Sequence, residues 1–276
     1  MTTQATAAAA TPTVRYAPIL AEARLQSRRQ WQLVAAVVAV CVAALAITGF
    51  FDATRFIESG PALQQLASEM VPPDFTRWRS WLRPLLDTLA MSVAGTALAV
   101  LLSLPLSLLA APNTSPNGVV LRAARTLLAA LRSVPEIILG ILFVAAVGFG
   151  ALPGVLALAL HSVGMVAKFY AEAIEHVDPK PLEAASAAGA TRSQVIAHAV
   201  LPQVLPQLAD ITIYRWEYHF RASAVLGIVG AGGIGFELMA ALRLIQYDQV
   251  AAILLTILAC VVVVDGIGAR LRKRLK

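Results

Sequence analysis

The chain has 276 residues, of which 58% are hydrophobic and 14% charged, and its formal net charge is +6 at pH 7. A soluble protein of this length would have too few polar side chains to cover its surface. The composition therefore excludes a soluble enzyme or a soluble binding protein and predicts an integral membrane protein. The positive charge does not indicate nucleic-acid binding, because the basic residues gather mainly at the ends of apolar segments, where membrane topology explains them better.

Apolar stretches of membrane-crossing length predict an all-α protein with six transmembrane helices. Residues 33–51 and 88–111 form uncharged runs of 19 and 24 residues, long enough to cross about 30 Å of hydrocarbon at about 1.5 Å per residue. A third uncharged run, 137–167, is interrupted by glycine and proline, so we expect two helices there that extend beyond it. The expected helices are at about 33–51, 86–111, 127–147, 152–175, 207–228 and 250–268, within a transmembrane domain 31–276 that follows a partly disordered tail, 1–30.

Basic residues assign both chain termini to the cytoplasm. They cluster in the N-terminal segment, after the second helix and in the C-terminal tail, and comprise Arg15, Arg24, Arg28, Arg29, Arg122, Arg125, Arg270, Arg272, Lys273, Arg274 and Lys276. The loops on the other side carry balanced, few or no charges. Because cytoplasmic loops of membrane proteins are enriched in arginine and lysine, the segment 178–206 between the fourth and fifth helices also faces the cytoplasm.

A pattern of small residues marks this cytoplasmic segment. Its members are Glu183, Ala184, Ala185, Gly189, Leu201 and Pro202. Small side chains allow another backbone to approach closely, and glycine permits a sharp turn that residues with a Cβ resist. An ordinary alanine-rich surface helix is the alternative, because alanine is the strongest helix former.

The pattern resembles the EAA loop of ABC importer permeases, in which Glu-Ala-Ala is followed after three residues by Gly and, nine residues later, by Ile, one residue and Leu-Pro. Ala199 stands at the position of the Ile. The resemblance implies two short helices that are joined at Gly189 and dock into a cleft of a separate ATPase subunit. We therefore expect residues 178–206 to be an ATPase-coupling loop.

Ionisable residues at membrane depth form a second candidate site. The fifth expected helix contains Arg215, Glu217, His219 and Arg221, and Glu136 lies about nine residues into the third. Each such group costs roughly 2.5–3.5 kcal/mol in a membrane, so all of them should face protein or water. Helical spacing pairs Arg215 with His219 and Glu217 with Arg221, and it leaves Glu136 available to an arginine.

Two interpretations of these five residues stay open. One is a basic path for an anion, because arginine binds phosphoryl oxygens through two parallel N–H groups. The other is a buried ion network that fixes helix packing or a dimer interface. We expect no metal site, because His219 has no second ligand at zinc spacing and Cys41 and Cys260 lie inside apolar runs that indicate packing.

Four glycines follow the fifth expected helix in a G-x-G-x-x-G pattern: Gly230, Gly232, Gly233 and Gly235. A dinucleotide-binding fold is excluded because the segment ends a membrane helix and belongs to no soluble βαβ unit. The glycines instead predict a flexible or tightly packed break in the helix, at a gate or hinge. Residues 221–235 resemble the corresponding block of methionine-type and phosphonate-type permeases.

Further motifs resemble the permeases of phosphonate ABC importers. They are the Pro72-Pro73-Asp74-Phe75 sequence with Trp78, residues 95–100 and residues 142–148. The resemblance covers about residues 70–275, and phosphite importers use closely related permeases, so the oxidation state of the phosphorus stays open. It implies a methionine-importer-like type I fold, and a homodimer in the bacterial inner membrane with two cytoplasmic ATPase subunits and an external binding protein.

The chain contains no G-x-x-x-x-G-K-[S/T] nucleotide-binding motif and no nucleophile elbow. We therefore expect a transporter subunit and not an enzyme, with no cofactor of its own and with ATP and Mg²⁺ on the partner ATPase. The expected function is translocation of a phosphonate or phosphite-type oxyanion by alternating access. The alternatives are a methionine-type or other small-solute ABC permease, or an ATP-independent secondary transporter whose charged fifth helix binds the substrate directly.

Overall fold

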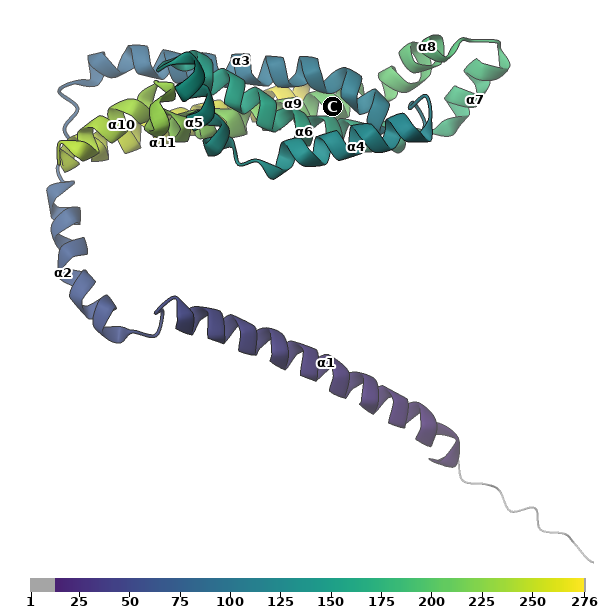
Figure 1. Cartoon of the computed structure of the whole chain (residues 1–276), viewed down its shortest axis with the longest axis horizontal. Helices are drawn as coiled ribbons and strands as arrows, with labels where there is room; N and C mark the ends of the chain where they lie inside the picture. The colour runs from purple at the N-terminus through teal and green to yellow at the C-terminus, as the bar shows by residue number, and fades with distance from the viewer. Residues whose placement is uncertain (1–12, 276) are drawn as a thin grey trace, which may run out of the picture. The chain divides into compact units, whose positions relative to one another are not determined.

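A computed structural model describes residues 13–275, in which every regular element is a helix. This confirms the all-α prediction. Of the partly disordered tail expected at residues 1–30, residues 1–12 lie outside the described range and residues 13–30 belong to a helix. The chain divides into two compact units, residues 1–65 and 66–276. Figure 1 labels the helices in chain order.

The first unit holds α1 (Thr13–Ile47) and most of α2 (Ala53–Glu69). Residues Gln26–Ile47 of α1 are long and apolar enough to cross a membrane. The helix expected at 33–51 thus ends earlier than predicted, where the backbone of Gly49 adopts a positive φ of 76°, a conformation that glycine reaches most easily.

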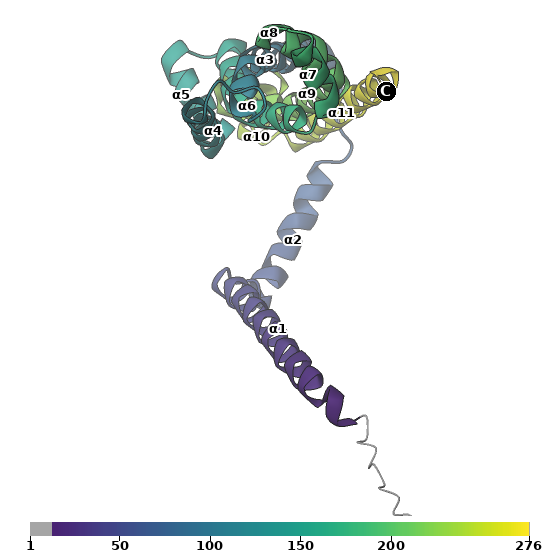
Figure 2. The ribbon, with the colours of Figure 1, turned by 90° about the vertical axis from the view of Figure 1, so that its right-hand side faces the viewer.

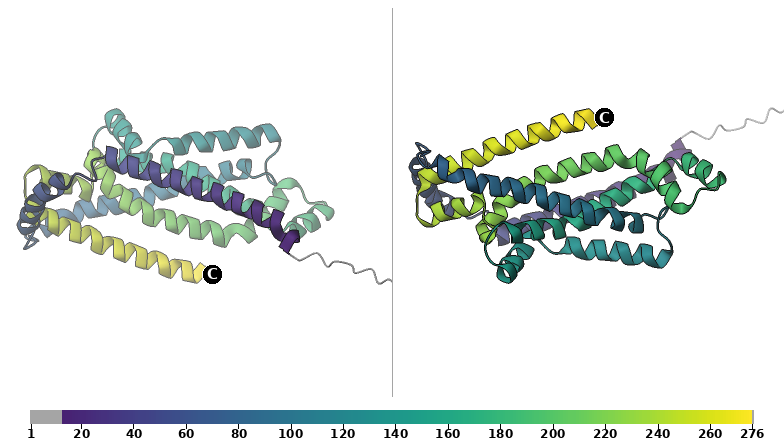
Figure 3. Two further views of the ribbon diagram at one scale, coloured as in Figure 1. Left: turned by 90° about the horizontal axis from the view of Figure 1, so that it is seen from below. Right: turned by 90° about the horizontal axis from the view of Figure 1, so that it is seen from above.

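The second unit is a bundle whose long helices run in a similar direction, as Figures 1 and 3 show, and which Figure 2 views nearly end-on. Its helices are α3 (Trp78–Ala110), α4 (Gly118–Ser133), α5 (Glu136–Val147), α6 (Ala151–Glu175), α9 (Leu201–Leu226), α10 (Ile234–Arg243) and α11 (Tyr247–Leu275). Helix α6 packs against α3, α4, α5 and α9. It therefore forms the centre of the bundle, and α11 covers α9 and α10.

Small residues bring α3 and α6 into close contact. A Cβ atom on Gly154 of α6 would lie 2.6 Å from the Met91 sulfur of α3, and one on Gly95 of α3 would lie 3.0 Å from the Leu158 Cβ of α6. Membrane helices associate through such small residues because lipid supplies no hydrophobic driving force between them.

Four described helices are long and apolar enough to span a membrane alone, and two bent helix pairs raise the number to six if each pair is one span. The bent pairs are α4 with α5, at 82°, and Arg192–Ala231 with α10, at 56°. Six spans agree with the number predicted, but two of the predicted helices are not straight.

The prediction of one continuous third helix at 127–147 is wrong. The chain breaks between α4 and α5 at Val134 and Pro135, where both residues are extended. Proline lacks an N–H to continue a helix and disfavours the helical conformation of the residue before it. Glu136 is consequently the first residue of α5 and does not lie nine residues deep in a helix.

The fifth helix begins earlier than the predicted residue 207. Helix α8 (Arg192–Val195) continues through a π-helical turn, η1 (Ile196–Val200), directly into α9. In this turn the N–H of Leu201 bonds the carbonyl of Ile196, five residues back. The wider turn suits the following Pro202, which has no N–H to donate to a carbonyl four residues back.

The glycine block forms a tight break between α9 and α10. It begins in a second π-helical turn, η2 (Gly227–Ala231), and Gly230, Gly232 and Gly233 have φ angles of 103°, 74° and 70°. Residues with a Cβ rarely adopt such angles. Gly235 lies so close to α9 that a Cβ on it would be 1.8 Å from the carbonyl oxygen of Ala224.

Replacing Gly235 by alanine should therefore destabilise the fold by about 1–3 kcal/mol, the usual range for overpacking. The matched control is Gly266→Ala in α11, where a Cβ would meet only the Arg270 side chain at 3.9 Å and where alanine improves helix propensity. Thermal unfolding of the purified protein in detergent measures both. A Gly235→Ala variant as stable as the control would contradict the tight packing.

Candidate functional site

The coupling segment, residues 178–206, forms a helical hairpin. Helix α7 (Pro179–Ala187) begins after Asp178, whose side chain accepts a hydrogen bond from the N–H of Lys180 at 3.0 Å. Gly189 turns the chain with a φ of 82°. Thr191 then starts α8 with a capping box, in which its own N–H donates to Gln194 Oε1 at 2.8 Å. Two helices thus meet at Gly189, as expected, but the second is not short, because it continues into α9.

The hairpin lies at one end of the bundle (Figures 1 and 3), and most residues of the predicted pattern are exposed. Those exposed to solvent are Glu183, Ala184, Gly189, Leu201 and Pro202, while Ala185 is half-buried. A Cβ on Gly189 would meet nothing within 4 Å. Ala199, at the usual position of Ile, is buried. The segment therefore presents a surface of small side chains that another protein can approach closely.

A buried polar network joins three helices in the membrane interior. Ser162 of α6 is its centre, because Arg215 Nε donates to its hydroxyl at 2.9 Å and His219 Nε2 lies 2.5 Å from the same oxygen. The other ring nitrogen of His219 lies 2.7 Å from the Thr96 hydroxyl of α3. Arg215 is only 4% exposed and His219 is fully buried. Burial with polar partners on three helices is what the ion-network interpretation expects of Arg215 and His219.

Glu136 does not pair with an arginine, contrary to the expectation. Its Oε1 instead accepts a hydrogen bond from the Tyr218 hydroxyl at 2.8 Å. The guanidinium of Arg215 lies over the ring of Tyr218, 4.2 Å from its centre, in a cation–π contact. Tyr218 therefore contacts both Glu136 and Arg215.

The expected pairing of Glu217 with Arg221 is also wrong, because α11 supplies a partner to each. Arg272 Nη1 lies 2.8 Å from Glu217 Oε1, and Arg221 Nη1 donates to Asp265 Oδ1 at 2.9 Å. Glu217 reaches α11 because Gly268 has no side chain there: a Cβ would be 1.9 Å from the carboxylate. Both ion pairs join α9 to α11, but only the pair of Glu217 has a buried member.

Arg221 belongs to an exposed stripe along α9, which consists of Asp210, Tyr214, Arg221 and Val225 and continues at Ile228 of η2. Successive positions are three, four or seven residues apart and so share one helix face. The side chains of Arg221 and Asp265 are 44% and 45% exposed, whereas that of Glu217 is 7% exposed. Charges at membrane depth are unstable against lipid, so this face requires water or a further protein surface. The structure thus separates a buried group (Arg215, Glu217, His219) from an exposed one (Arg221).

The residues that complete these sites were not found from the sequence. Ser162 and Thr96 are single hydroxyl residues in apolar helices, and Asp265 and Arg272 were not connected with the fifth helix. Of these four residues, only Asp265 could have been found from the sequence, because it is a charged residue within an apolar run. Among residues 13–275, no group of three or more His, Cys, Asp or Glu side chains could hold a metal ion.

The Pro72-Pro73-Asp74-Phe75 motif forms a fixed turn before α3. The N–H and hydroxyl of Thr76 donate to the Asp74 carboxylate at 2.8 and 2.9 Å, and these bonds lower the pKa of Asp74. The N–H of Asp74 bonds the carbonyl of Asp248 in α11. The ring of Phe75 packs edge-on against Trp81. The motif therefore ties the start of α3 to the start of α11.

Known proteins place the chain in one family. Residues 103–276 match the family described as the binding-protein-dependent transport system inner membrane component. The chain is 63% identical to the phosphite transport system permease protein PtxC of Stutzerimonas stutzeri, over 90% of each chain. It is 40% identical to the phosphate-import permease protein PhnE of Mycolicibacterium smegmatis, over 81% of this chain and 42% of that one.

Solved structures agree on the fold. The MetNI methionine ABC transporter, in inward-facing conformations, matches with a TM-score of 0.63 at 23% identity, over 71% of this chain and 96% of that chain. A bacterial ABC transporter for the acidic polysaccharide alginate matches with a TM-score of 0.60 at 18% identity, over 91% of this chain and 99% of that chain. The expected fold, that of an ABC importer permease, is confirmed. The chain belongs to the family of binding-protein-dependent transport system inner membrane components.

Proposed function

We propose that this chain is the permease subunit of an ATP-driven importer that carries phosphite or a phosphonate across the bacterial inner membrane by alternating access. The substrate is assigned from the 63% identity to a phosphite transport permease, which extends over 90% of both chains. Phosphite and phosphonates share a tetrahedral phosphorus oxyanion, and phosphite is the first candidate. The methionine-type alternative has less support, because a probable D-methionine transport permease is 29% identical over only 54% of this chain and the 23% identity to a solved methionine transporter concerns the fold alone.

The energy for transport comes from two cytoplasmic ATPase subunits that bind ATP and Mg²⁺. Support for this step is the exposed coupling segment, whose small residues Ala184 and Gly189 leave room for a partner. An external binding protein delivers the oxyanion, in keeping with the family of the chain. Both chain termini lie in the cytoplasm, since the basic residues of the tails and of the first turns of α4 favour that side.

Two copies of the chain form the transport path between them. The exposed stripe of α9 supports this arrangement, because Arg221 and Asp265 are each almost half-exposed on a helix pair at membrane depth. A second copy facing this stripe would remove it from lipid and enclose a polar path. Arg221 is the residue that meets the anion, whereas Arg215, His219 and Glu217 hold the helices in place and Glu136 holds Tyr218.

Transport follows from movement of the coupling segments. ATP binding closes the ATPases and draws the two segments together, which tilts the helices and opens the path to the docked binding protein. Hydrolysis reverses the movement and releases the oxyanion inside. The glycine break from Gly230 to Gly235 serves as the gate at the other end of α9, because it already departs from helical geometry.

Uptake by liposomes that contain this chain, its ATPase and its binding protein tests the function. We expect ATP-dependent accumulation of phosphite or of a simple phosphonate in preference to phosphate and methionine. Accumulation of methionine alone would support an ATP-driven importer but would reject a phosphorus oxyanion as its substrate. Flux without ATP would favour a secondary transporter and overturn the proposal.

The substitution Gly189→Pro tests the coupling segment. Proline fixes φ near −65°, whereas Gly189 has a φ of 82° and its N–H bonds the carbonyl of Ser186. We expect uptake to fall at least about tenfold, a loss of about 1.4 kcal/mol or more in coupling, while the protein remains inserted. The matched control is Gly118→Pro at the first residue of α4, where proline is well tolerated. Normal uptake by the Gly189→Pro variant would show that residues 178–206 do not couple the permease to the ATPase.

Identical substitutions at two arginines of α9 test the division between packing and path. Arg215→Gln leaves the Ser162 and His219 network without its cation, and we expect it to lower stability by about 1–3 kcal/mol and to reduce the yield of folded protein. Arg221→Gln removes a half-exposed charge, so we expect normal folding and an uptake at least about tenfold lower. Size-exclusion profiles and uptake of the oxyanion measure the two effects. If Arg221→Gln transports normally, or loses folded protein as Arg215→Gln does, the anion does not meet Arg221.

A further inference from the structure

Arg192 is the first residue of α8, and its charge opposes the helix at this position. The N-terminus of a helix carries a partial positive charge, so cations are favoured at the other end. Arg192 therefore does not stabilise its own helix. Its guanidinium reaches away from α8 to the loop between α3 and α4, where Nη2 donates to the carbonyl oxygen of Thr114 at 2.9 Å and to that of Ser115.

The receiving loop, residues 111–117, is firmly held. Thr114 and Ser115 are 5% and 7% exposed. The N–H groups of both residues bond the carbonyl of Ala111, and the Thr114 hydroxyl donates to the carbonyl of Leu108 in α3 at 2.7 Å. The arginine thus binds two carbonyls of a compact turn that moves with the end of α3.

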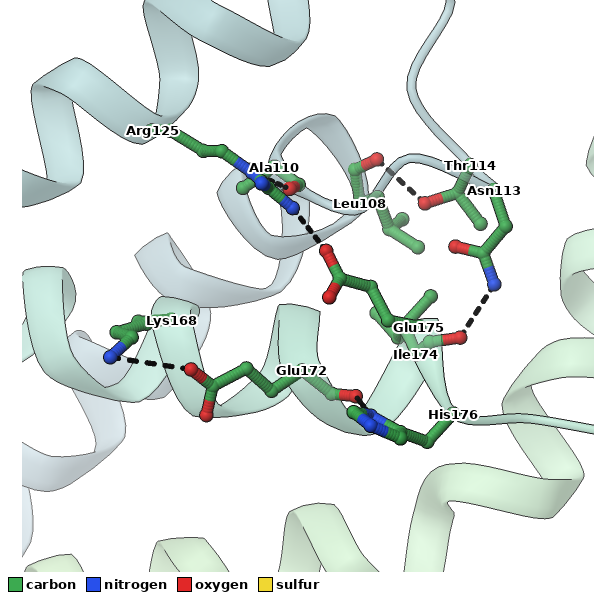
Figure 4. Close-up of polar contacts among 10 residues, drawn as sticks. All are labelled: Leu108, Ala110, Asn113, Thr114, Arg125, Lys168, Glu172, Ile174, Glu175 and His176. Atoms are coloured by element: carbon green, nitrogen blue, oxygen red, sulfur yellow. Dashed lines mark hydrogen bonds and ion pairs between the residues drawn. The ribbon is translucent and has the colours of Figure 1, made fainter. Parts of the chain in front are cut away.

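Side chains also tie this loop to α4 and α6, as Figure 4 shows. Asn113 donates to the carbonyl of Ile174 near the end of α6 at 2.6 Å. Arg125 of α4 donates to the carbonyl of Ala110 at 3.0 Å and forms an ion pair with Glu175 of α6. Asn117 caps the start of α4 by accepting from two N–H groups. A displacement of the loop consequently displaces the adjoining ends of α3, α4 and α6.

The coupling segment meets the bundle along the chain, through apolar packing and through Arg192. The chain runs from α6 through residues 176–178 into α7, and from α8 through η1 into α9. Leu182 and Val200 pack in an apolar cluster with Ala110, Ala111 and Ile174. From α8 itself, Arg192 reaches the loop, whose bonded carbonyls lie 77 and 78 positions earlier in the sequence. Without this contact, a movement of α8 would reach α9 along the chain but would reach α3 and α4 only indirectly.

We propose that Arg192 is a positioning residue that transmits the movement of the coupling segment to α3 and α4, so that ATP hydrolysis and opening of the path occur together. The inference rests on the proposed function. Arginine suits this role because its planar group can bond two neighbouring carbonyls at once and keeps its charge at all relevant pH values. Loss of the contact should leave the partner ATPase bound and active but disconnected from the transport path.

The test is the ratio of ATP hydrolysed to oxyanion imported, in liposomes that contain the whole transporter and its binding protein. For Arg192→Gln we expect uptake at least about tenfold lower, with ATP hydrolysis and co-purification of the ATPase near those of the unchanged protein. Arg192→Lys keeps the charge without the planar group, so its ratio of ATP hydrolysed to oxyanion imported should lie between those of Arg192→Gln and the unchanged protein. The matched control is Arg122→Gln, which removes an exposed cation of α4 that bonds its own helix at Gly118 and should leave the ratio unchanged.

The other outcomes each reject a different statement. An unchanged ratio in Arg192→Gln would show that the contact transmits nothing. A parallel loss of hydrolysis and uptake in an assembled complex would place Arg192 in ATPase stimulation instead, and loss of the assembled complex in both variants would make it purely structural. If the unchanged protein fails to couple hydrolysis to uptake of any phosphorus oxyanion, the proposed function itself fails, whatever the variants do.

Discussion

The membrane interior offers no water to a polar side chain, and the arrangement of the bundle follows from this constraint. Each polar group that α9 carries into the membrane needs a partner on another helix, because lipid cannot supply one. The Ser162 hydroxyl is the polar partner of both Arg215 and His219, and Arg272 forms an ion pair with Glu217. These contacts fix α9 relative to α6 and α11. The position of α9 in turn determines which of its faces is left for water or for a second subunit.

Close packing makes these contacts geometrically possible. Gly268 leaves space for the Glu217 carboxylate, and Gly164 of α6 leaves space for Arg132 and the backbone of α4. In both places the missing side chain belongs to one helix and the polar or charged group to its neighbour. The glycines of the bundle are thus part of its electrostatics as well as of its packing, since larger residues would separate the charges from their partners.

The sequence predicted the parts of the structure that depend on local patterns. Apolar run lengths indicated six spans, and the spacing from Glu183 to Pro202 indicated two helices that meet at Gly189, because both signals lie within short stretches of chain. The ion pairs could not be predicted in the same way. Helical spacing offered Arg221 as the partner of Glu217, but Arg272, 55 positions along the chain, takes that place. Tertiary contacts of this kind override local pairing, and hydroxyl residues such as Ser162 carry no signal of their role until the helices are assembled.

The π-helical turn between α8 and α9 sets the rotational phase of the two helices. A π turn holds one residue more than an α-helical turn, and each residue of an α-helix advances its side chains by about 100°. If the turn at Ile196–Val200 closed into regular α-helix, the exposed alanines of the hairpin and the stripe at Arg221 would turn relative to each other by about 100°, little more than a quarter of a revolution. The single extra residue therefore aligns the exposed surface of the hairpin with the exposed face of α9.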